Sequence, residues 1–303
     1  MKISILIGSR NRINALERCL KSVVLQDYSD IEVLVLDDSD NQNEYKKLFR
    51  TIKDPRFQLF HSPRPLGVSG SRNSLMEKAK GDIYFFIDDD AYFDEKDSLT
   101  IILESFLAQP RVGILAFKIQ NHGESEREYN VPFNTGTLKR NPQLIGQSRF
   151  VAYFLGTAHA IRKDVIKECG LYNNALFFGE EELDLSYRAI SHGWEIYYES
   201  NVLVHHMPQP SVIGKGNCMG EELFHHVKNR FYLAFSYLPA RFIPLYLGIW
   251  TSKYLLDAIQ IGAFKFYIKG IIKGLFWLRI IRRDALKPEA IEYLRENFGR
   301  LWY

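Results

Sequence analysis

Residues 84–90 read Tyr-Phe-Phe-Ile-Asp-Asp-Asp, an apolar run that ends abruptly in three consecutive carboxylates. Aromatic and β-branched residues in such a run predict an interior strand of a covered sheet. In open α/β sheets, ligands bind beyond the carboxyl ends of the strands, which is where these acids would lie. Adjacent carboxylates repel one another, so either solvent in an acidic turn or a divalent cation must compensate them. The second alternative predicts a metal–diphosphate site, because Mg²⁺ and Mn²⁺ take oxygen ligands and share them with substrate phosphates.

The segments around residues 84–90 alternate between predicted strands and predicted helices. Apolar runs typical of strands occur near residues 3–7, 32–36, 57–60 and 112–119, and helical spacing occurs near residues 16–24, 45–49, 73–80 and 97–107. This alternation predicts an α/β fold with a mostly parallel, doubly wound sheet. Residues 63–70 are predicted to form a loop, whose glycines would let the backbone approach a ligand.

The second half of the chain is less regular. Residues 122–148 are polar and rich in Asn, Pro and Gly, which predicts a long loop without a period. A strand interrupted at Gly156, a short helix and an acidic helix starting near Glu180 follow, and then two strands near residues 194–198 and 202–204. Residues 209–220 have the proline and glycine content of a mobile loop.

Four landmarks stand in order along this framework. They are the polar turn 8–12 after the first strand, Asp37-Asp38-Ser39 after the second, Asp88-Asp89-Asp90, and Glu181-Glu182-Leu183-Asp184-Leu185 followed by His205. In this order and spacing the chain resembles inverting family-2 glycosyltransferases of the GT-A fold, over roughly residues 1–206. The resemblance implies a mixed doubly wound sheet flanked by helices.

The resemblance also implies a donor site. Asp38 would bind the base or ribose of a nucleotide-sugar, Ser9, Asn11 and Arg12 would shape the same pocket, and Arg72 would line its nucleotide side. Asp88 and Asp90 would be the acids of the family's Asp-x-Asp motif and would hold Mn²⁺ or Mg²⁺, with Asp90 the closer ligand. Asp89 is counted with the donor-binding residues, and His205 matches a family histidine that approaches the metal or the diphosphate. His206 should point to the opposite side of the strand.

The acidic helix would supply the reacting carboxylate. By the resemblance, Glu182 falls on the catalytic base, although Asp is more common there, and the turn after the second strand is one residue shorter than usual. Glu181 and Asp184 would bind the acceptor, or they are solvated on the helix surface. Acids in a first helical turn are also favoured by the helix dipole, which explains some of them without any function.

These features predict a metal-dependent inverting glycosyltransferase that moves a sugar from a nucleoside-diphosphate sugar to a glycan or lipid-linked acceptor, in cell-surface polysaccharide biosynthesis. Residues 1–119 would bind the nucleotide-sugar, residues 120–224 the acceptor, and residues 225–303 would form a basic helical region. A sugar nucleotidyltransferase is an alternative, but the turn 8–12 lacks repeated glycines. A degenerate binding module is another, although both key carboxylate positions are intact.

The C-terminal region differs in charge from the rest of the chain. Residues 225–303 hold 13 Lys/Arg against 5 Asp/Glu, and charges interrupt residues 231–283 throughout, so these helices are too polar to cross a membrane. Lys265, Lys269 and Lys273 share one helix face, with apolar residues opposite, which predicts helices lying on an anionic membrane surface. The aromatic residues Trp250, Tyr254, Phe276 and Trp277 are expected at the headgroup boundary. The alternative is packing on the catalytic region or a second subunit; the bulky aliphatic residues disfavour nucleic acid.

The expected location is the cytoplasm, at the inner face of the membrane. The apolar start of the chain is short and predicts a strand instead of a signal peptide. Three scattered cysteines are too few for a disulfide framework and suggest a reducing compartment.

Overall fold

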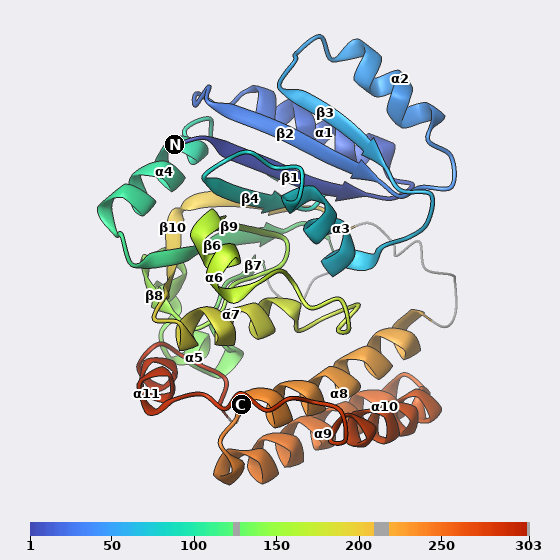
Figure 1. Ribbon diagram of the computed structural model, residues 1–303, viewed down its shortest axis with the longest axis vertical. Coiled ribbons are helices and arrows are strands. Elements are labelled where there is room, and N and C mark those ends of the chain that lie inside the picture. The colour runs from blue at the N-terminus through green and yellow to red at the C-terminus, as the bar shows by residue number, and fades with distance from the viewer. Residues whose placement is uncertain (124–127, 209–217, 302–303) are drawn as a thin grey trace.

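The computed structural model describes residues 1–123, 128–208 and 218–301. Its centre is a ten-stranded sheet with the order β3-β2-β1-β4-β9-β6-β10-β5, to which β7 adds beside β6 and β8 beside β10 (Figure 1). The strands are β1 (Ile3–Ser9), β2 (Ile31–Asp37), β3 (Phe57–His61), β4 (Ile83–Ile87), β5 (Ala91–Phe93), β6 (Val112–Asn121), β7 (Tyr129–Asn130), β8 (Arg149–Val151), β9 (Ala158–Arg162) and β10 (Glu195–His206).

The predicted mixed, doubly wound sheet is confirmed. Strand β1 pairs in parallel with β2 and β4. The direction changes at β9, which is antiparallel to both of its neighbours, β4 and β6. Strand β5, directly after the three acids, runs antiparallel to the end of β10. This pairing brings the end of β10 beside the carboxyl end of β4.

Helices cover both faces of the sheet because alternate strand residues point to opposite sides. Ile3, Ile5 and Ile7 enter one core with α1 and α4, whereas Leu6 enters a second core with α3, α6 and α7. The helices are α1 (Ile13–Val24), α2 (Asn43–Thr51), α3 (Gly67–Met76), α4 (Ser98–Ala108), α5 (Thr135–Arg140), α6 (Lys163–Cys169), α7 (Glu181–Ser191), α8 (Cys218–Tyr237), α9 (Ile243–Gln260), α10 (Phe264–Trp277) and α11 (Pro288–Glu296), with 3₁₀ turns η1 (Pro142–Gly146) and η2 (Ala240–Phe242).

Three local predictions differ from the structure. Helix α3 begins at Gly67, whose φ of +69° suits glycine, and it ends at Met76, so part of the predicted loop is helical. The predicted loop 122–148 contains β7, α5 and η1. The two strands predicted around residues 194–204 are one strand, β10, with a register shift between Glu199 and Leu203. Most of the predicted mobile loop, residues 209–217, lies outside the described residues.

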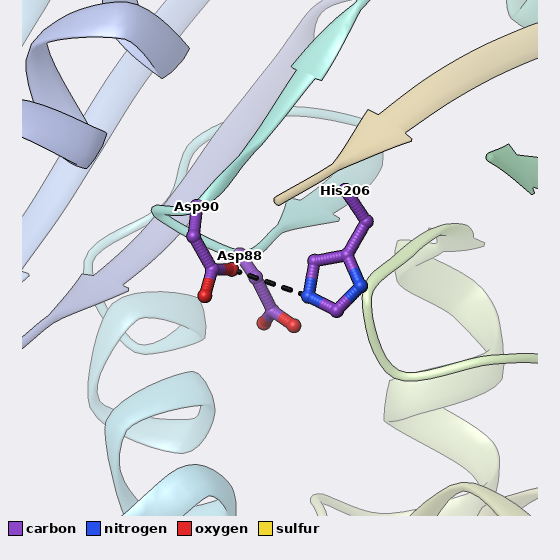
Figure 2. A group of neighbouring side chains, drawn as sticks. All are labelled: Asp88, Asp90 and His206. Atoms are coloured by element: carbon purple, nitrogen blue, oxygen red, sulfur yellow. Dashed lines mark ion pairs between the residues drawn. The ribbon is translucent and has the colours of Figure 1, made fainter. Parts of the chain in front are cut away.

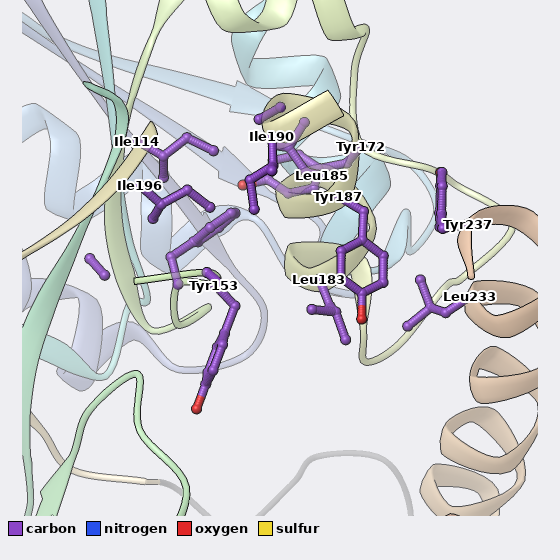
Figure 3. Packing of buried hydrophobic residues seen from close by; sticks show 14 of the residues in the cluster. Ile114, Tyr153, Tyr172, Leu183, Leu185, Tyr187, Ile190, Ile196, Leu233 and Tyr237 are labelled. Carbon is purple, nitrogen blue, oxygen red and sulfur yellow. The ribbon is translucent and has the colours of Figure 1, made fainter. Parts of the chain in front are cut away.

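The C-terminal helices form a separate layer beneath α7 (Figure 1). Leu233 and Tyr237 of α8 face Leu183 and Tyr187 of α7 and extend the second core (Figure 3). Helix α10 packs closely on α8, because a Cβ at Gly274 would meet the side chain of Phe231 at 2.6 Å. Both predicted region boundaries fall inside elements, residue 119 in β6 and residue 224 in α8, and the division into three regions stays a prediction.

Within the described ranges, every helix is too short or too polar to span a bilayer.

Candidate functional site

Asp88, Asp90 and His206 form a cluster at the carboxyl end of β4 (Figure 2). One ligand atom from each lies within 4.8 Å of the others, and His206 Nε2 is 3.4 Å from Asp90 Oδ1. Burial raises the pKa of Asp88 to about 6, against the opposing charge of Arg72. Two carboxylates and an imidazole are a donor set that suits Mn²⁺, and the buried negative charge favours a cation there.

The prediction that His205 faces this cluster is wrong, because the alternation of β10 turns it to the other side of the sheet. Its Nε2 lies 2.7 Å from Asp94 Oδ1, and its Nδ1 lies 2.7 Å from His122 Nε2. Residues 205 and 206 are paired with Tyr92 and Ala91 of β5, so adjacent positions fix opposite orientations. The histidine beside Asp88 and Asp90 is therefore His206.

Arg12 forms ion pairs with Asp89 and Asp90. Its guanidinium contacts Asp90 Oδ2 and Asp89 Oδ1 at 2.7 Å each. Asp89 is fully buried and also accepts a hydrogen bond of 2.6 Å from Ser9 Oγ. Burial raises the pKa of Asp89 to about 7, while Arg12 and Ser9 oppose the shift. Asp89 thus joins the turn after β1 to the end of β4, and it does not line the cavity described next.

A cavity of about 350 Å³ lies beside the acids, between the ends of β1, β2 and β4 and the start of α3. Five residues predicted to bind the donor line it, namely Ser9, Arg12, Asp38, Arg72 and Asp88. Asp38 accepts a hydrogen bond of 3.1 Å from the backbone of Leu66, and burial raises its pKa. The other two, Asp89 and Asn11, do not line it; Asn11 is exposed, but its left-handed backbone, with a φ of 54°, shapes the turn.

Arg72 joins this cavity to the acidic helix. Its Nη1 donates to Glu182 Oε1 at 2.9 Å, and its Nη2 donates to the Gly156 carbonyl at 2.9 Å. Glu182 lies against the backbone at Gly156, where a Cβ would overlap its carboxylate. A side-chain exposure of 16% leaves Glu182 accessible from a small cavity of about 160 Å³. A partly exposed carboxylate beside the donor cavity fits the position of a general base.

The other acids of α7 do not face an acceptor, contrary to the prediction for Glu181 and Asp184. Asp184 is fully buried; its Oδ2 contacts Arg188 at 2.6 Å and its Oδ1 accepts from Tyr237 at 2.7 Å. Glu181 is buried behind Glu182, and burial together with the charge of Glu182 raises its pKa well above the usual value. Both side chains are held inside the protein, where an acceptor sugar cannot reach them.

Helix α8 holds the start of the acidic helix. Glu180 has a left-handed backbone, with a φ of 64°, and its carboxylate is 2.9 Å from Arg230 Nη2. A non-glycine residue in this conformation costs about 1–3 kcal/mol, so the surrounding contacts must hold it. Asn229 donates to the carbonyls of Leu176, Phe178 and Gly179. The C-terminal layer therefore helps to position the segment that carries Glu182.

Comparison of the sequence with known families identifies the family of this chain. The sequence model described as glycosyl transferase family 2 matches residues 4–170, more than half of the chain. The chain belongs to this family. The match includes the turn after β1, Asp38, Arg72 and the three acids after β4, but it ends before α7. The family match thus covers the acids after β4 and most of the cavity beside them.

Two curated relatives illustrate how far the likeness to family 2 extends. An uncharacterized protein of Haemophilus influenzae is 30% identical over 173 residues, 55% of this chain and 91% of that protein. The GalNAc(5)-diNAcBac-PP-undecaprenol β-1,3-glucosyltransferase of Campylobacter jejuni is 24% identical over 183 residues, 59% of this chain and 57% of that protein. The chain thus spans little more than half the length of that glucosyltransferase.

Solved structures show the GT-A fold. TarS 1-349 of S. aureus has a TM-score of 0.61 at 15% identity, and the match covers 92% of this chain and 83% of that one. A mannosyltransferase from Pyrobaculum calidifontis, solved with GDP-Man and Mn²⁺, has a TM-score of 0.55 at 15% identity and covers 97% of this chain and 74% of that one. At this identity the likeness shows the fold alone, and the predicted GT-A architecture of this family 2 chain is confirmed.

Proposed function

We propose that this family 2 glycosyltransferase moves a hexose from a nucleoside-diphosphate sugar to a glycan or lipid-linked acceptor, with metal dependence and inversion of the anomeric centre. The arrangement that supports the proposal is the short path from the cluster of Asp88, Asp90 and His206, past Arg72, to Glu182. A polysaccharide of the cell surface is the expected product.

In this proposal, different residues recognise the nucleoside of the donor and compensate the charge of its diphosphate. Asp38 would accept hydrogen bonds from the ribose or base, and Ser9 and Arg12 would shape the same cavity. Asp88, Asp90 and His206 would hold Mn²⁺ or Mg²⁺, which when bound supplies positive charge to the donor diphosphate. Arg72 adds a fixed, buried guanidinium on the cavity wall, close to where the diphosphate departs.

Glu182 would act on the acceptor. Its carboxylate takes the proton of the acceptor hydroxyl while that oxygen forms a bond to the anomeric carbon. The bond from the anomeric carbon to the diphosphate oxygen breaks with its electron pair, and the nucleoside diphosphate leaves. A single displacement of this kind inverts the anomeric centre. Arg72 holds the Glu182 carboxylate in place through the 2.9 Å hydrogen bond.

The test is release of nucleoside diphosphate from a panel of UDP- and GDP-sugars, with Mn²⁺, Mg²⁺ or excess chelator. We expect at least one donor to turn over with metal and none with chelator, and NMR of the product to show the inverted anomer. Turnover that is indifferent to chelator would contradict metal dependence, and a retained anomer would contradict the single displacement. Sugar-1-phosphate activation without transfer would favour a nucleotidyltransferase, which the family match already disfavours.

We further propose that α9 and α10 bind an anionic membrane surface, as their sequence predicts. Lys265, Lys269 and Lys273 are exposed. Large apolar side chains are also exposed on α9, α10 and the turn after α10: Leu245, Leu256, Ile259, Ile261, Phe264, Ile268, Ile272, Leu275, Phe276, Leu278 and Ile280. Apolar area beside basic side chains suits a headgroup boundary, where each basic residue contributes roughly 1 kcal/mol.

One part of the membrane prediction needs correction. Trp250, Tyr254 and Trp277 were expected at the headgroup boundary but are buried, whereas Phe276 is 48% exposed. The buried three pack toward α8, so the contact with lipid would rely on the aliphatic side chains and the lysines. The location on the inner face of the membrane stays a prediction.

Liposome flotation tests the membrane proposal. Wild-type protein should float with vesicles that contain phosphatidylglycerol and less with pure phosphatidylcholine. A triple change of Lys265, Lys269 and Lys273 to Glu should abolish flotation, while the same change at the exposed Lys46, Lys47 and Lys53 should not. Indifference to anionic lipid, or a stable dimer that covers α10, would contradict the proposal.

A further inference from the structure

We propose that the cavity between the catalytic layer and helix α9 binds the pyranoside end of the acceptor, with Tyr153 and Arg300 as its recognition residues. The inference rests on the proposed glycosyl transfer and replaces the predicted acceptor contacts of Glu181 and Asp184.

The cavity has a volume of about 590 Å³ and lies between two parts of the chain. One wall comes from residues 130–135 and Tyr153 of the catalytic layer, and the other comes from α8 and α9, including Trp250 and Tyr254. Its size falls within the range of about 300–1,000 Å³ that is typical of small-molecule sites. Aromatic walls with a few polar groups suit the apolar faces and hydroxyls of a sugar ring.

The buried hydroxyl of Tyr153 points to a ligand. Its side chain is 4% exposed, and its hydroxyl has no hydrogen-bond partner among the described residues. A buried hydroxyl without a partner destabilises the fold, so such groups usually meet a partner in the functional state. Figure 3 shows the hydroxyl directed away from the packed cluster of Leu183 and Ile196. Tyr153 also lines the cavity.

Arg300 presents the second polar group. Its guanidinium lies 4.1 Å from the centre of the Tyr153 ring and makes no hydrogen bond or ion pair with the part of the chain that the structure describes. The other cations of the wall have partners, since Arg230 pairs with Glu180 and Lys253 lies 3.6 Å from Asp257. The acidic lining residues Glu180, Glu222 and Asp257 match the three basic ones in number, so the cavity favours a neutral saccharide whose hydroxyls accept from Arg300 and Tyr153.

The cavity also leads to the reacting carboxylate. The smaller cavity of about 160 Å³ beside Glu182 and Gly156 shares Tyr153, Arg230 and Arg300 with it. A sugar bound at Tyr153 would therefore have a path to Glu182, while the donor cavity lies on the other side of Arg72. Donor and acceptor would approach Glu182 from different sides, as a single displacement requires.

Saturation-transfer NMR with methyl and p-nitrophenyl β-D-pyranosides of glucose, galactose and their N-acetylamino forms tests the inference. We expect at least one glycoside to bind the full chain, and Tyr153→Phe and Arg300→Met each to weaken it about fivefold or more, as expected for loss of one hydrogen bond. Tyr198→Phe is the matched control, because that buried hydroxyl donates to Ile145 outside the cavity. Circular dichroism and UDP or GDP titration with Mn²⁺ check folding and the donor site in each variant.

Two outcomes would overturn the inference. One is that no glycoside binds; the other is that binding is unchanged in both Tyr153→Phe and Arg300→Met. The nucleotide titration separates this failure from failure of the proposed function. Nucleotide binding without glycoside recognition at Tyr153 would remove only the acceptor site, whereas absence of both would remove the proposed glycosyl transfer as well.

Discussion

Arg72 Nη1 lies 2.9 Å from Glu182 Oε1, while the same side chain lines the cavity that contains Asp88. A single buried residue of α3 therefore contacts the acidic helix and the donor side together. Because its second nitrogen is held by the Gly156 carbonyl, the guanidinium has one orientation that satisfies both contacts. This geometry explains why an arginine, with its planar fork, is present here.

Arg72→Lys should preserve the charge and lose one of these two hydrogen bonds. We expect kcat to fall about tenfold or more, on the scale of one charge-assisted hydrogen bond, with a smaller change in the donor KM. Arg56→Lys is the matched control, because Arg56 contacts Asp54 at 2.7 Å on the surface away from the site. Equal kinetics for Arg72→Lys and wild type would show that the fork geometry does not matter.

The adjacent histidines of β10 provide a test of the metal site. His206→Ala should weaken Mn²⁺ binding, measured by calorimetry with nucleoside diphosphate present, by about tenfold or more. Asp90→Ala should abolish metal-dependent donor binding. His205→Ala should leave the Mn²⁺ affinity unchanged, because His205 faces Asp94 and His122. The reverse order of effects would place the metal on the other side of the strand.

The ion pair of Arg230 and Glu180 should contribute to stability only as a pair. Both side chains are buried, with 3% and 9% residue exposure, so removing one partner leaves an uncompensated charge. Arg230→Met should lower the free energy of unfolding by roughly 3–5 kcal/mol. The double variant with Glu180→Gln should lose less than the sum of the single losses, measured by urea unfolding. Additive losses would show that the pair is not coupled.

His226 should make the stability of this cluster depend on pH, because its Nδ1 lies 3.1 Å from Glu180 Oε1. Burial and Arg230 lower the pKa of His226, but Glu180 and Glu222 outweigh them and raise it above the usual value. A raised pKa in the folded state contributes stability below about pH 6.5, and that contribution is lost as the pH rises through the folded-state value. Thermal unfolding of His226→Asn should therefore differ from wild type at pH 6 and converge with it at pH 9.

The magnitude of the His226 effect should be modest. About a third of the His226 side chain is exposed, and solvent screens the pair, so the loss should be about 1 kcal/mol or less. A difference between the variant and wild type that grows toward pH 9 would contradict the sign.

The positions of the acids and polar turns at one sheet edge could be predicted from the sequence because these signals are local. An apolar run followed by acids defines both β4 and its functional end, and the polar turns after β1 and β2 fall at the same sheet edge. Local sequence signals do not decide which of His205 and His206 faces Asp88 and Asp90. The choice depends on the register shift within β10, between Glu199 and Leu203, and a strand's alternation changes its facing residues at such a point.

The acceptor side depends on contacts between distant segments. Asp184 has the sequence context of a site residue, yet it is buried in the core, where it accepts a hydrogen bond from Tyr237 of α8, 53 residues away. The cavity at Tyr153 exists only because α9 and residue 300 return to the catalytic layer. No periodicity near residue 153 indicates this cavity, whereas the acidic motif of residues 181–185 is visible in the sequence, and the resemblance therefore places acceptor contacts on α7.

We propose that Glu182 removes the acceptor proton at a metal-dependent donor site. The most direct measurement is the turnover of a metal-dependent donor and its acceptor by Glu182→Gln, alongside donor binding by the same variant, with Glu181→Gln as the neighbouring control. Glu182→Gln should bind the donor with Mn²⁺ nearly as wild type does but turn over more slowly by about 10²-fold or more. Turnover of Glu182→Gln near the wild-type rate, or the larger loss in Glu181→Gln, would contradict this proposal.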